Sequence, residues 1–303
     1  MNTFDEDAFI DLPIIMDGFI NDYFFKKSGS LVYHYASFEN TLSITGNFVF
    51  TAGGSVLYHT RYNELSDDYE GQEVEECYLE ALNKYCLSHK LEKRVADLLY
   101  SIKPNDTYLY YMTERAGVDH AYKAKGIAYI CCFSFNGDSE YMWNNYLKGE
   151  KSGFAIGYNT TNLKSNANDY FGNGYKHIIQ KVLYKKEDKI KFIYDFLNEL
   201  LSKTHREPAL NFYVSNFLNC NKYVFKRLSF SDEEEVRSVI FYPEDGHCNL
   251  KTINNGTIIP FKFDFGTSID DLIYYHNGND DREMFLISQT HILNSVKKSK
   301  FCK

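Results

Sequence analysis

The sequence predicts an α+β protein, with a mixed or antiparallel sheet interrupted by helical insertions. Short segments rich in aromatic and β-branched residues recur along the chain, such as LVYHYAS at 31–37 and GIAYICCFSF at 126–135. Apolar residues follow a period near 3.6 residues in two blocks, at about 72–100 and 186–226. Because strands and helices do not alternate regularly, a mixed or antiparallel sheet is favoured over a parallel βαβ architecture.

The other predicted elements fit this plan. GFAIGYN at 153–159 and IIQKVLYK at 178–185 have the composition of strands, and MWNNY at 142–146 that of a short helical turn. We find no convincing linker, so residues 31–303 are expected to form one domain. Residues 1–30 precede it as an accessory segment that ends in the turn-like KKSGS.

Two helices are predicted inside the second block. Ile190 and Leu201 bound a stretch whose apolar residues share one face, and Pro208 is expected to break this helix. A second helix is expected from Leu210 to Val224. The segment DEEEVRSVIF that follows is expected to be a strand.

The composition limits the classes of function. A net charge of −8 argues against a non-specific nucleic-acid binder, although nucleic acid could still be an acceptor substrate. No apolar stretch approaches the roughly 20 residues that span a bilayer, and the start of the chain is acidic where a signal peptide would be basic. We therefore expect a cytoplasmic protein without membrane contact.

The aromatic and cysteine contents restrict the function less than the charge does. The 26 Tyr and 24 Phe reflect either a general compositional bias or a stacking platform for a nucleotide base. The seven cysteines include no C-x-x-C pair, which removes zinc-ribbon and redox-motif interpretations.

The first candidate site is YHYAS at 33–37. On a strand, His34 points to one face of the sheet while Tyr33 and Tyr35 point to the other. His34 could bind a ribose or phosphate, or it could be a core histidine bonded to backbone. Tyr33, Tyr35 and Ser37 are expected to contact the ligand.

The second candidate is the acidic loop ELSDDYEG at 64–71. Its carboxylates at Asp67, Asp68 and Glu70 could bind a hard cation. The spacing of a calcium loop is absent, and a solvated loop is the alternative.

The third candidate is the stretch between two predicted strands that contains the single tryptophan. Ser134 lies where a strand runs out into a loop, a common place for a residue that meets a ligand. Trp143 either packs in the core or offers a face for stacking. No G-x-S-x-G surrounds Ser134, which argues against a hydrolase nucleophile.

The fourth candidate is the strand that contains Glu233, Glu235 and Arg237. On a regular strand all three point to one face, where burial would be costly unless they pair with each other or with a ligand. The alternative is a solvated edge strand.

Taken in order, YHYAS, LSDDYEG, CFS, MWNNY with SGFAIGY, and EEEVR resemble the bacterial domain-of-unknown-function family 2971 over roughly residues 31–290. That family has a Y-H-Y-[TS]-S start, an N-D-P-[FY]-E loop, a C-F-S strand end, an M-W-x-x-Y element and a late E-x-E-x-R. This chain departs from the pattern in its loop, which lacks the Asn and Pro, and at Phe230, where Trp is common.

The layout also resembles, more distantly, ADP-ribosyltransferase-like folds, which use NAD as a substrate. This resemblance implies that His34 holds the NAD ribose or amide and that Ser134 supports the nicotinamide side. Trp143 or Tyr146 would shape the pocket.

By the same resemblance, Glu235 would be the catalytic carboxylate and Glu233 would assist the acceptor. Arg237 would fix the pair or a phosphate. The implied function is an ADP-ribosyltransferase or NAD glycohydrolase, with a role as a toxin or phage-defence effector.

Two other classes of function remain open. A metal-dependent hydrolase or nuclease would use the carboxylates of the acidic loop together with Glu233 and Glu235. A non-catalytic sensor would present the surplus Tyr and Phe side chains as an exposed patch. In that case residues 1–30 could dock a partner protein or an antitoxin.

Overall fold

The computed structural model describes residues 30–37, 55–65, 71–103, 108–115, 118–147, 149–163, 176–243, 251–253, 256–263, 269–276 and 297–302. These residues form two compact units. The first contains the described residues within 67–126 and 182–230, and the second those within 27–66, 127–181 and 231–303. Both predicted helical insertions therefore lie in the first unit.

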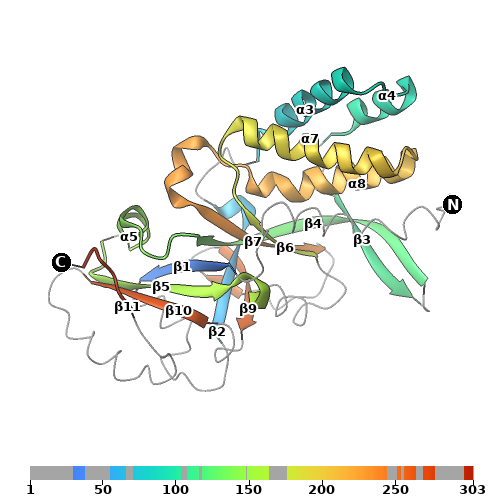
Figure 1. Ribbon diagram of the computed structural model, residues 1–303. Coiled ribbons are helices and arrows are strands. Elements are labelled where there is room, and N and C mark those ends of the chain that lie inside the picture. The colour runs from blue at the N-terminus through green and yellow to red at the C-terminus, as the bar shows by residue number, and fades with distance from the viewer. Residues whose placement is uncertain are drawn as a thin grey trace. The chain divides into compact units, whose positions relative to one another are not determined.

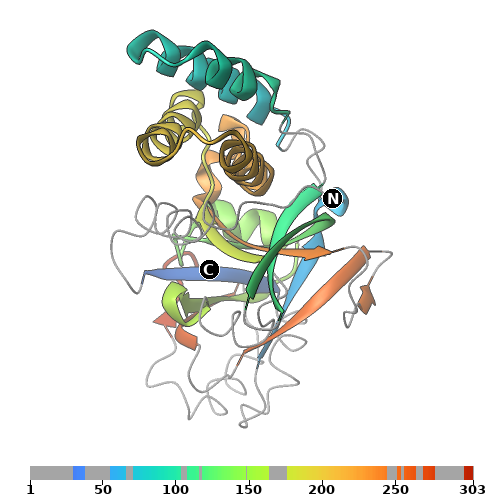
Figure 2. The same ribbon diagram turned by 90° about the vertical axis from the view of Figure 1, so that its right-hand side faces the viewer.

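The first unit is helical. The block predicted at 72–100 forms α3 (Val74–Ser88) and α4 (Lys93–Ser101), and the block at 186–226 forms α7 (Lys186–Lys203) and α8 (Glu207–Asn221). Figure 2 shows α7 and α8 nearly end-on and side by side. Strand β3 (Tyr108–Arg115) pairs antiparallel with the first half of β4 (Val118–Ser134).

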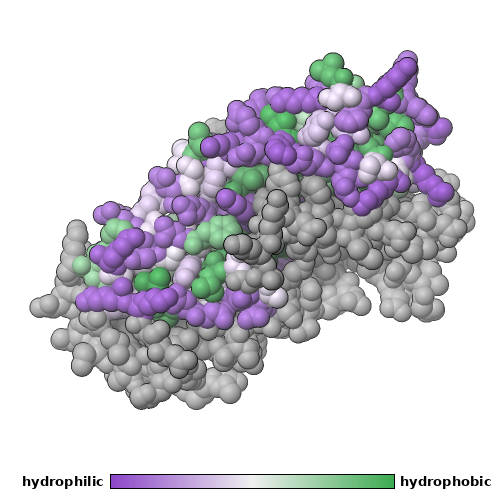
Figure 3. All heavy atoms as spheres, viewed as in Figure 1, coloured by the Kyte–Doolittle hydropathy of each residue, from purple (hydrophilic) through white to green (hydrophobic). Residues whose placement is uncertain are grey.

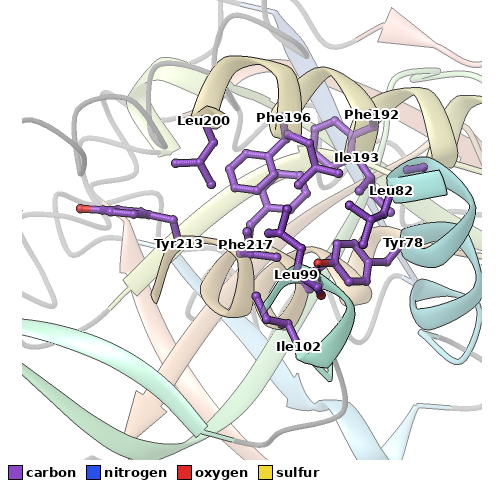
Figure 4. Packing of buried hydrophobic residues seen from close by; sticks show 14 of the residues in the cluster. Tyr78, Leu82, Leu99, Ile102, Phe192, Ile193, Phe196, Leu200, Tyr213 and Phe217 are labelled. Atoms are coloured by element: carbon purple, nitrogen blue, oxygen red, sulfur yellow. Dashed lines mark hydrogen bonds between the residues drawn. The ribbon is translucent and has the colours of Figure 1, made fainter. Parts of the chain in front are cut away.

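Aromatic and aliphatic side chains together fill the core of this unit (Figure 4). The rings of Phe196 on α7 and Phe217 on α8 stack with centroids 3.6 Å apart. The buried ammonium of Lys189 donates to the backbone oxygen of Lys226 and pairs with Glu73, which compensates its burial. Burial of aromatic and aliphatic side chains between helices stabilises this unit.

The prediction for Pro208 was wrong in its mechanism. Helix α7 already ends at Lys203, where Thr204 has an extended backbone. Pro208 lies in the first turn of α8, where its missing N–H costs no hydrogen bond. The proline therefore starts the second helix rather than breaking the first.

The second unit is built on the sheet, which confirms the predicted α+β class (Figure 1). Its strands run in the order β11-β10-β5-β1-β4-β2-β9-β8, with β7 also paired to β4 and β6 paired to β7. The pairing of β10 with β11 is parallel, whereas β1, β4 and β5 pair antiparallel, so the sheet is mixed. The bounds are β1 Leu31–Ser37, β2 Ser55–Arg61, β5 Ser152–Asn159, β6 Lys176–Lys181, β7 Glu235–Pro243, β8 Lys251–Ile253, β9 Gly256–Phe263, β10 Ile269–His276 and β11 Lys297–Lys298.

The register of β1 assigns its side chains to two faces of the sheet. Tyr33 is paired with Ser134 on β4 and with Gly157 on β5. Directly paired residues share a face and successive residues alternate. We call the side that carries Tyr33, Tyr35 and Ser37 the tyrosine face, and the side that carries His34 the histidine face. Ser134 therefore lies on the tyrosine face.

Several predictions fall outside the described residues. They concern Asp67, Asp68 and Glu70 of the acidic loop, and almost all of the accessory segment 1–30. Among the helices that the structure describes, none combines the length and apolarity needed to cross a membrane.

The described surface in Figure 3 is mostly hydrophilic, with hydrophobic residues scattered over it. The large hydrophobic side chains that are exposed among the described residues are Leu87, Tyr100 and Leu228. Tyr100 is the single aromatic one, so this part of the chain presents no exposed aromatic patch.

Candidate functional site

The segment that contains Trp143 packs against the tyrosine face of the sheet. Ser139 is the N-cap of helix α5 (Glu140–Tyr146). Its hydroxyl accepts a hydrogen bond from the backbone N–H of Met142. Trp143 is 1% exposed, packs edge-on against Tyr35 at 4.6 Å and stacks on Tyr275 at 5.1 Å. With both contacts inside the core, Trp143 offers no free face for stacking on a ligand.

The indole N–H of Trp143 donates to Asp138 at 2.9 Å. The same carboxylate accepts hydrogen bonds from the hydroxyl of Ser299 and the backbone N–H of Lys300. Asp138 thus ties the segment 297–302 to the tryptophan.

Tyr33 is half-buried and donates from its hydroxyl to Asp271 at 3.0 Å. Burial, followed by the hydrogen bond and charge of Asp271, raises the pKa of Tyr33 to about 12. Two glycines make room for its ring: a Cβ at Gly137 would lie 2.6 Å from the ring, and one at Gly157 would lie 3.0 Å from it.

Tyr35 and Ser37 are both buried on the tyrosine face. The Tyr35 hydroxyl donates to the backbone oxygen of Asn136 at 2.7 Å and accepts from the backbone N–H of Ser139 at 3.0 Å. These bonds hold the loop between β4 and α5, so Tyr35 supports this loop.

Ser134, at the end of β4, also stabilises the loop between β4 and α5. It is fully buried, and its hydroxyl accepts a hydrogen bond from the backbone N–H of Asn136 at 3.1 Å. This closes a short serine turn at the strand end. Ser134 lies on the tyrosine face, and its hydroxyl oxygen is used by the turn.

His34 lies on the opposite side of the sheet from Ser134. Its Nδ1–H donates to the backbone oxygen of Cys132 at 2.9 Å, and its ring packs edge-on against Phe133 at 5.8 Å. Burial lowers the pKa of His34 below its ordinary value, which favours the neutral ring. The structure thus matches the core-histidine interpretation of His34.

The late acidic motif forms a buried ion pair. Arg237 donates from Nε to Glu235 Oε1 at 2.7 Å and from Nη2 to Oε2 at 3.2 Å. The side chain of Arg237 is 1% exposed and that of Glu235 is 2% exposed. The alternative of a solvated edge strand is therefore wrong for this pair.

The strand begins later than the sequence predicts. Glu233 ends a 3-10 helix at Leu228–Glu233, and β7 starts at Glu235. Between them Glu234 has φ +45, a conformation that is uncommon for a residue with a side chain. Its backbone oxygen accepts from the N–H of Phe135 at 3.0 Å, which joins the start of β7 to the end of β4.

Tyr146, the last residue of α5, lies close enough to Glu233, Glu235 and Arg237 for their charges to act on its hydroxyl. Its pKa is raised well above the ordinary value, first by burial and then by the charges of Cys132, Glu233 and Glu235, while Arg237 acts in the opposite direction. The phenol therefore stays protonated and can act as a hydrogen-bond donor. We define the carboxylate cluster as Glu233, Glu235, Arg237 and Tyr146.

Gln180 is a residue that sequence reasoning missed. It stands on β6 directly opposite Arg237, so the two side chains share a face. It is fully buried, and neither its amide nitrogen nor its amide oxygen has a hydrogen-bond partner in the described part of the chain. The sequence places Gln180 between Ile179 and Lys181, and a glutamine in such a strand does not by itself separate a site from a surface position.

A second polar group was also missed. The hydroxyl of Ser238 is hydrogen-bonded to Nε2 of His59 at 2.9 Å and to Nε2 of His177 at 2.7 Å. Within the described residues, no group of three His, Cys, Asp or Glu side chains is arranged to hold a metal. The metal-site hypothesis also needs Asp67, Asp68 and Glu70 of the acidic loop, which lie outside these residues.

The second unit is thus an α+β sheet unit that buries an acid–arginine pair beside an amide and a phenol. Residues 142–238 match the family described as protein of unknown function (DUF2971), which confirms the family resemblance over that segment. The matched segment contains Tyr146, Gln180, Glu233, Glu235 and Arg237. Neither the curated proteins nor the solved structures gave a match, and the likeness to ADP-ribosyltransferase-like folds stays a prediction.

Proposed function

We propose that this protein uses NAD as a substrate, as an ADP-ribosyltransferase or NAD glycohydrolase, with Glu235 as the catalytic carboxylate. The observation that carries the proposal is the buried Glu235, held through both oxygens by Arg237. A charge that is fixed and shielded from water stabilises a developing cation more strongly than a solvated one does.

The reaction would begin with cleavage of the bond between ribose C1′ and the nicotinamide nitrogen. The electron pair goes to that nitrogen, nicotinamide leaves neutral, and positive charge develops on the ribose. Glu235 stabilises this charge. An oxygen of water or of an acceptor then bonds to C1′ and gives its proton to Glu233, which is buried near the same phenol.

Tyr146 and Arg237 have supporting roles in this proposal. The raised pKa of Tyr146 keeps its hydroxyl protonated, so that it can donate to a ribose hydroxyl. Arg237 fixes the orientation of Glu235. We assign no role to His34, because its Nδ1–H is bonded to backbone. A toxin or phage-defence role stays a prediction.

The test is release of nicotinamide from NAD by wild type, Glu235→Gln and the control Glu234→Gln. Glu234 is the exposed carboxylate next to Glu235, so its variant makes the same chemical change outside the cluster. Loss of one group that stabilises transition-state charge typically lowers kcat about 100- to 1,000-fold, and we expect that effect for Glu235→Gln alone. Circular dichroism and Tm must show that both variants are folded.

Two results would contradict the proposal. One is equal release by wild type and a folded Glu235→Gln variant. The other is no release by wild type, either alone or with cell extract as a source of acceptor, which would favour the non-catalytic binding protein.

A further inference from the structure

Gln180 is a polar side chain in a position where an apolar one would be more stable. It lies within β6, between Ile179 and Lys181, and is fully buried. Its carboxamide has no hydrogen-bond partner among the residues that the structure describes. Buried polar groups without a partner are destabilising and rare in folded proteins. A bound ligand that pairs with this amide would account for its presence.

The chemistry of the amide restricts the ligand group. A carboxamide presents an acceptor oxygen beside two N–H donors, so its best partner offers a donor and an acceptor side by side. A second carboxamide meets this condition. A carboxylate or phosphate offers acceptors alone and would leave the Gln180 oxygen unpaired.

The neighbouring charges restrict it further. Arg237, directly opposite Gln180 on β7, is already bonded to Glu235, and Glu233 adds a second carboxylate to the cluster. These two carboxylates and the guanidinium, each of which also has further interactions, carry a formal charge of about −1 between them. Such a site disfavours an anion and favours a cationic ring that carries a neutral amide.

We propose that Gln180 binds the carboxamide of the nicotinamide ring and thereby selects nicotinamide over nicotinic acid. The inference rests on the proposed function for the identity of the ligand, and it adds a residue that sets ligand specificity. It also places the nicotinamide end, rather than a phosphate, beside Arg237.

The burial of the site has a kinetic consequence. Gln180 and Arg237 are 0% and 1% exposed, so a ligand reaches them only after the covering atoms move aside. Association that needs such an opening is slower than ordinary docking. Nicotinamide should therefore bind with a rate that reaches a plateau as its concentration rises.

The experiment measures binding of nicotinamide and nicotinic acid to the full chain by titration calorimetry. We expect nicotinamide to bind at least 10-fold more tightly than nicotinic acid. Gln180→Met, which keeps the length of the side chain but removes the amide, should bind nicotinamide at least 10-fold more weakly than wild type does. Its Tm should stay equal or rise, because an unpaired buried amide has been removed. The matched control is Gln72→Met, an exposed glutamine outside the sheet unit.

The outcomes separate this inference from the proposed function. Gln180-dependent nicotinamide binding without NAD turnover would support the inference and contradict the enzyme. NAD turnover with the same nicotinamide affinity in wild type and Gln180→Met would support the enzyme and overturn the inference. No binding of nicotinamide to wild type, or binding of adenosine that is lost in Gln180→Met, would also overturn it.

Discussion

Arg237 donates two hydrogen bonds to the carboxylate of Glu235, two residues earlier on the same strand. Residues at i and i+2 of a strand share a face, so no other element is needed to bring these groups together. Both side chains are almost completely buried. Well-packed apolar residues of similar size are often as stable as a buried ion pair, so stability alone does not account for its presence.

The first prediction concerns the stability of this pair. Arg237→Met would leave the Glu235 carboxylate buried without its guanidinium. We expect the free energy of unfolding to fall by about 3–5 kcal/mol, as measured by urea denaturation. The double variant Glu235→Met with Arg237→Met should recover most of this loss. If the two single losses simply add, the pair is not energetically coupled.

The second prediction concerns the space that the Tyr33 ring needs. A Cβ at Gly137 would lie 2.6 Å from this ring, so Gly137→Ala should lower the free energy of unfolding by about 1–3 kcal/mol. Combining it with Tyr33→Ala should remove most of the penalty, because the ring is the source of the clash. Urea denaturation of all the variants measures the coupling.

Gly149→Ala provides the control for this cycle. Gly149 has φ +88 and no atom within 4 Å of an added Cβ, so its alanine variant is destabilised by backbone strain. Its cost should add to that of Tyr33→Ala without coupling. Coupling of similar size in both cycles would contradict the steric explanation for Gly137.

The third prediction uses the single tryptophan as a reporter. Asp138→Ala removes the acceptor for the Trp143 indole and for two groups of the segment 297–302. We expect a loss of about 1–3 kcal/mol and a red shift of the fluorescence of Trp143. Asp97→Ala, an exposed aspartate on α4, is the control and should change neither quantity. An unchanged spectrum for a folded Asp138→Ala would contradict the contact.

The fourth prediction concerns pH. Burial lowers the pKa of His34 below 6.5 and that of His59 well below it. The unfolded chain therefore binds protons near pH 6.5 that the folded chain does not bind. Stability should be complete above pH 6.5 and fall as the pH decreases below it, by up to about 1.4 kcal/mol per pH unit for each histidine.

Urea denaturation between pH 8 and pH 5 tests this slope. His59→Gln removes one titrating group, so its stability should depend less steeply on pH over the acidic part of that range. Parallel slopes for wild type and variant would contradict the burial of a neutral His59.

The EEEVR segment shows how far the sequence could predict the candidate site. Strand alternation correctly put Glu235 and Arg237 on one side, because this follows from backbone geometry alone. Their burial could not be predicted, since it depends on which parts of the chain cover the strand. The turn at Glu234 was also missed, because it forms where β7 joins the end of β4.

His34 and Gln180 show a second limit of what the sequence can predict. The local pattern separates the two sides of a strand but does not state which residue of another strand lies opposite. That register placed His34 and Ser134 on opposite faces and set Gln180 against Arg237. A shift by one residue would reverse both relationships.

The sequence by itself determined the α+β class, the two helical blocks and the strand motifs, because periodicity and backbone propensity act over a few neighbouring residues. The tertiary structure decided which motif packs as part of the core and which forms the candidate site. Trp143 became core because Tyr35 packs edge-on against its ring and Tyr275 stacks on it. The carboxylate cluster formed because strands distant in sequence pair in one register, and such contacts leave no trace in the local pattern.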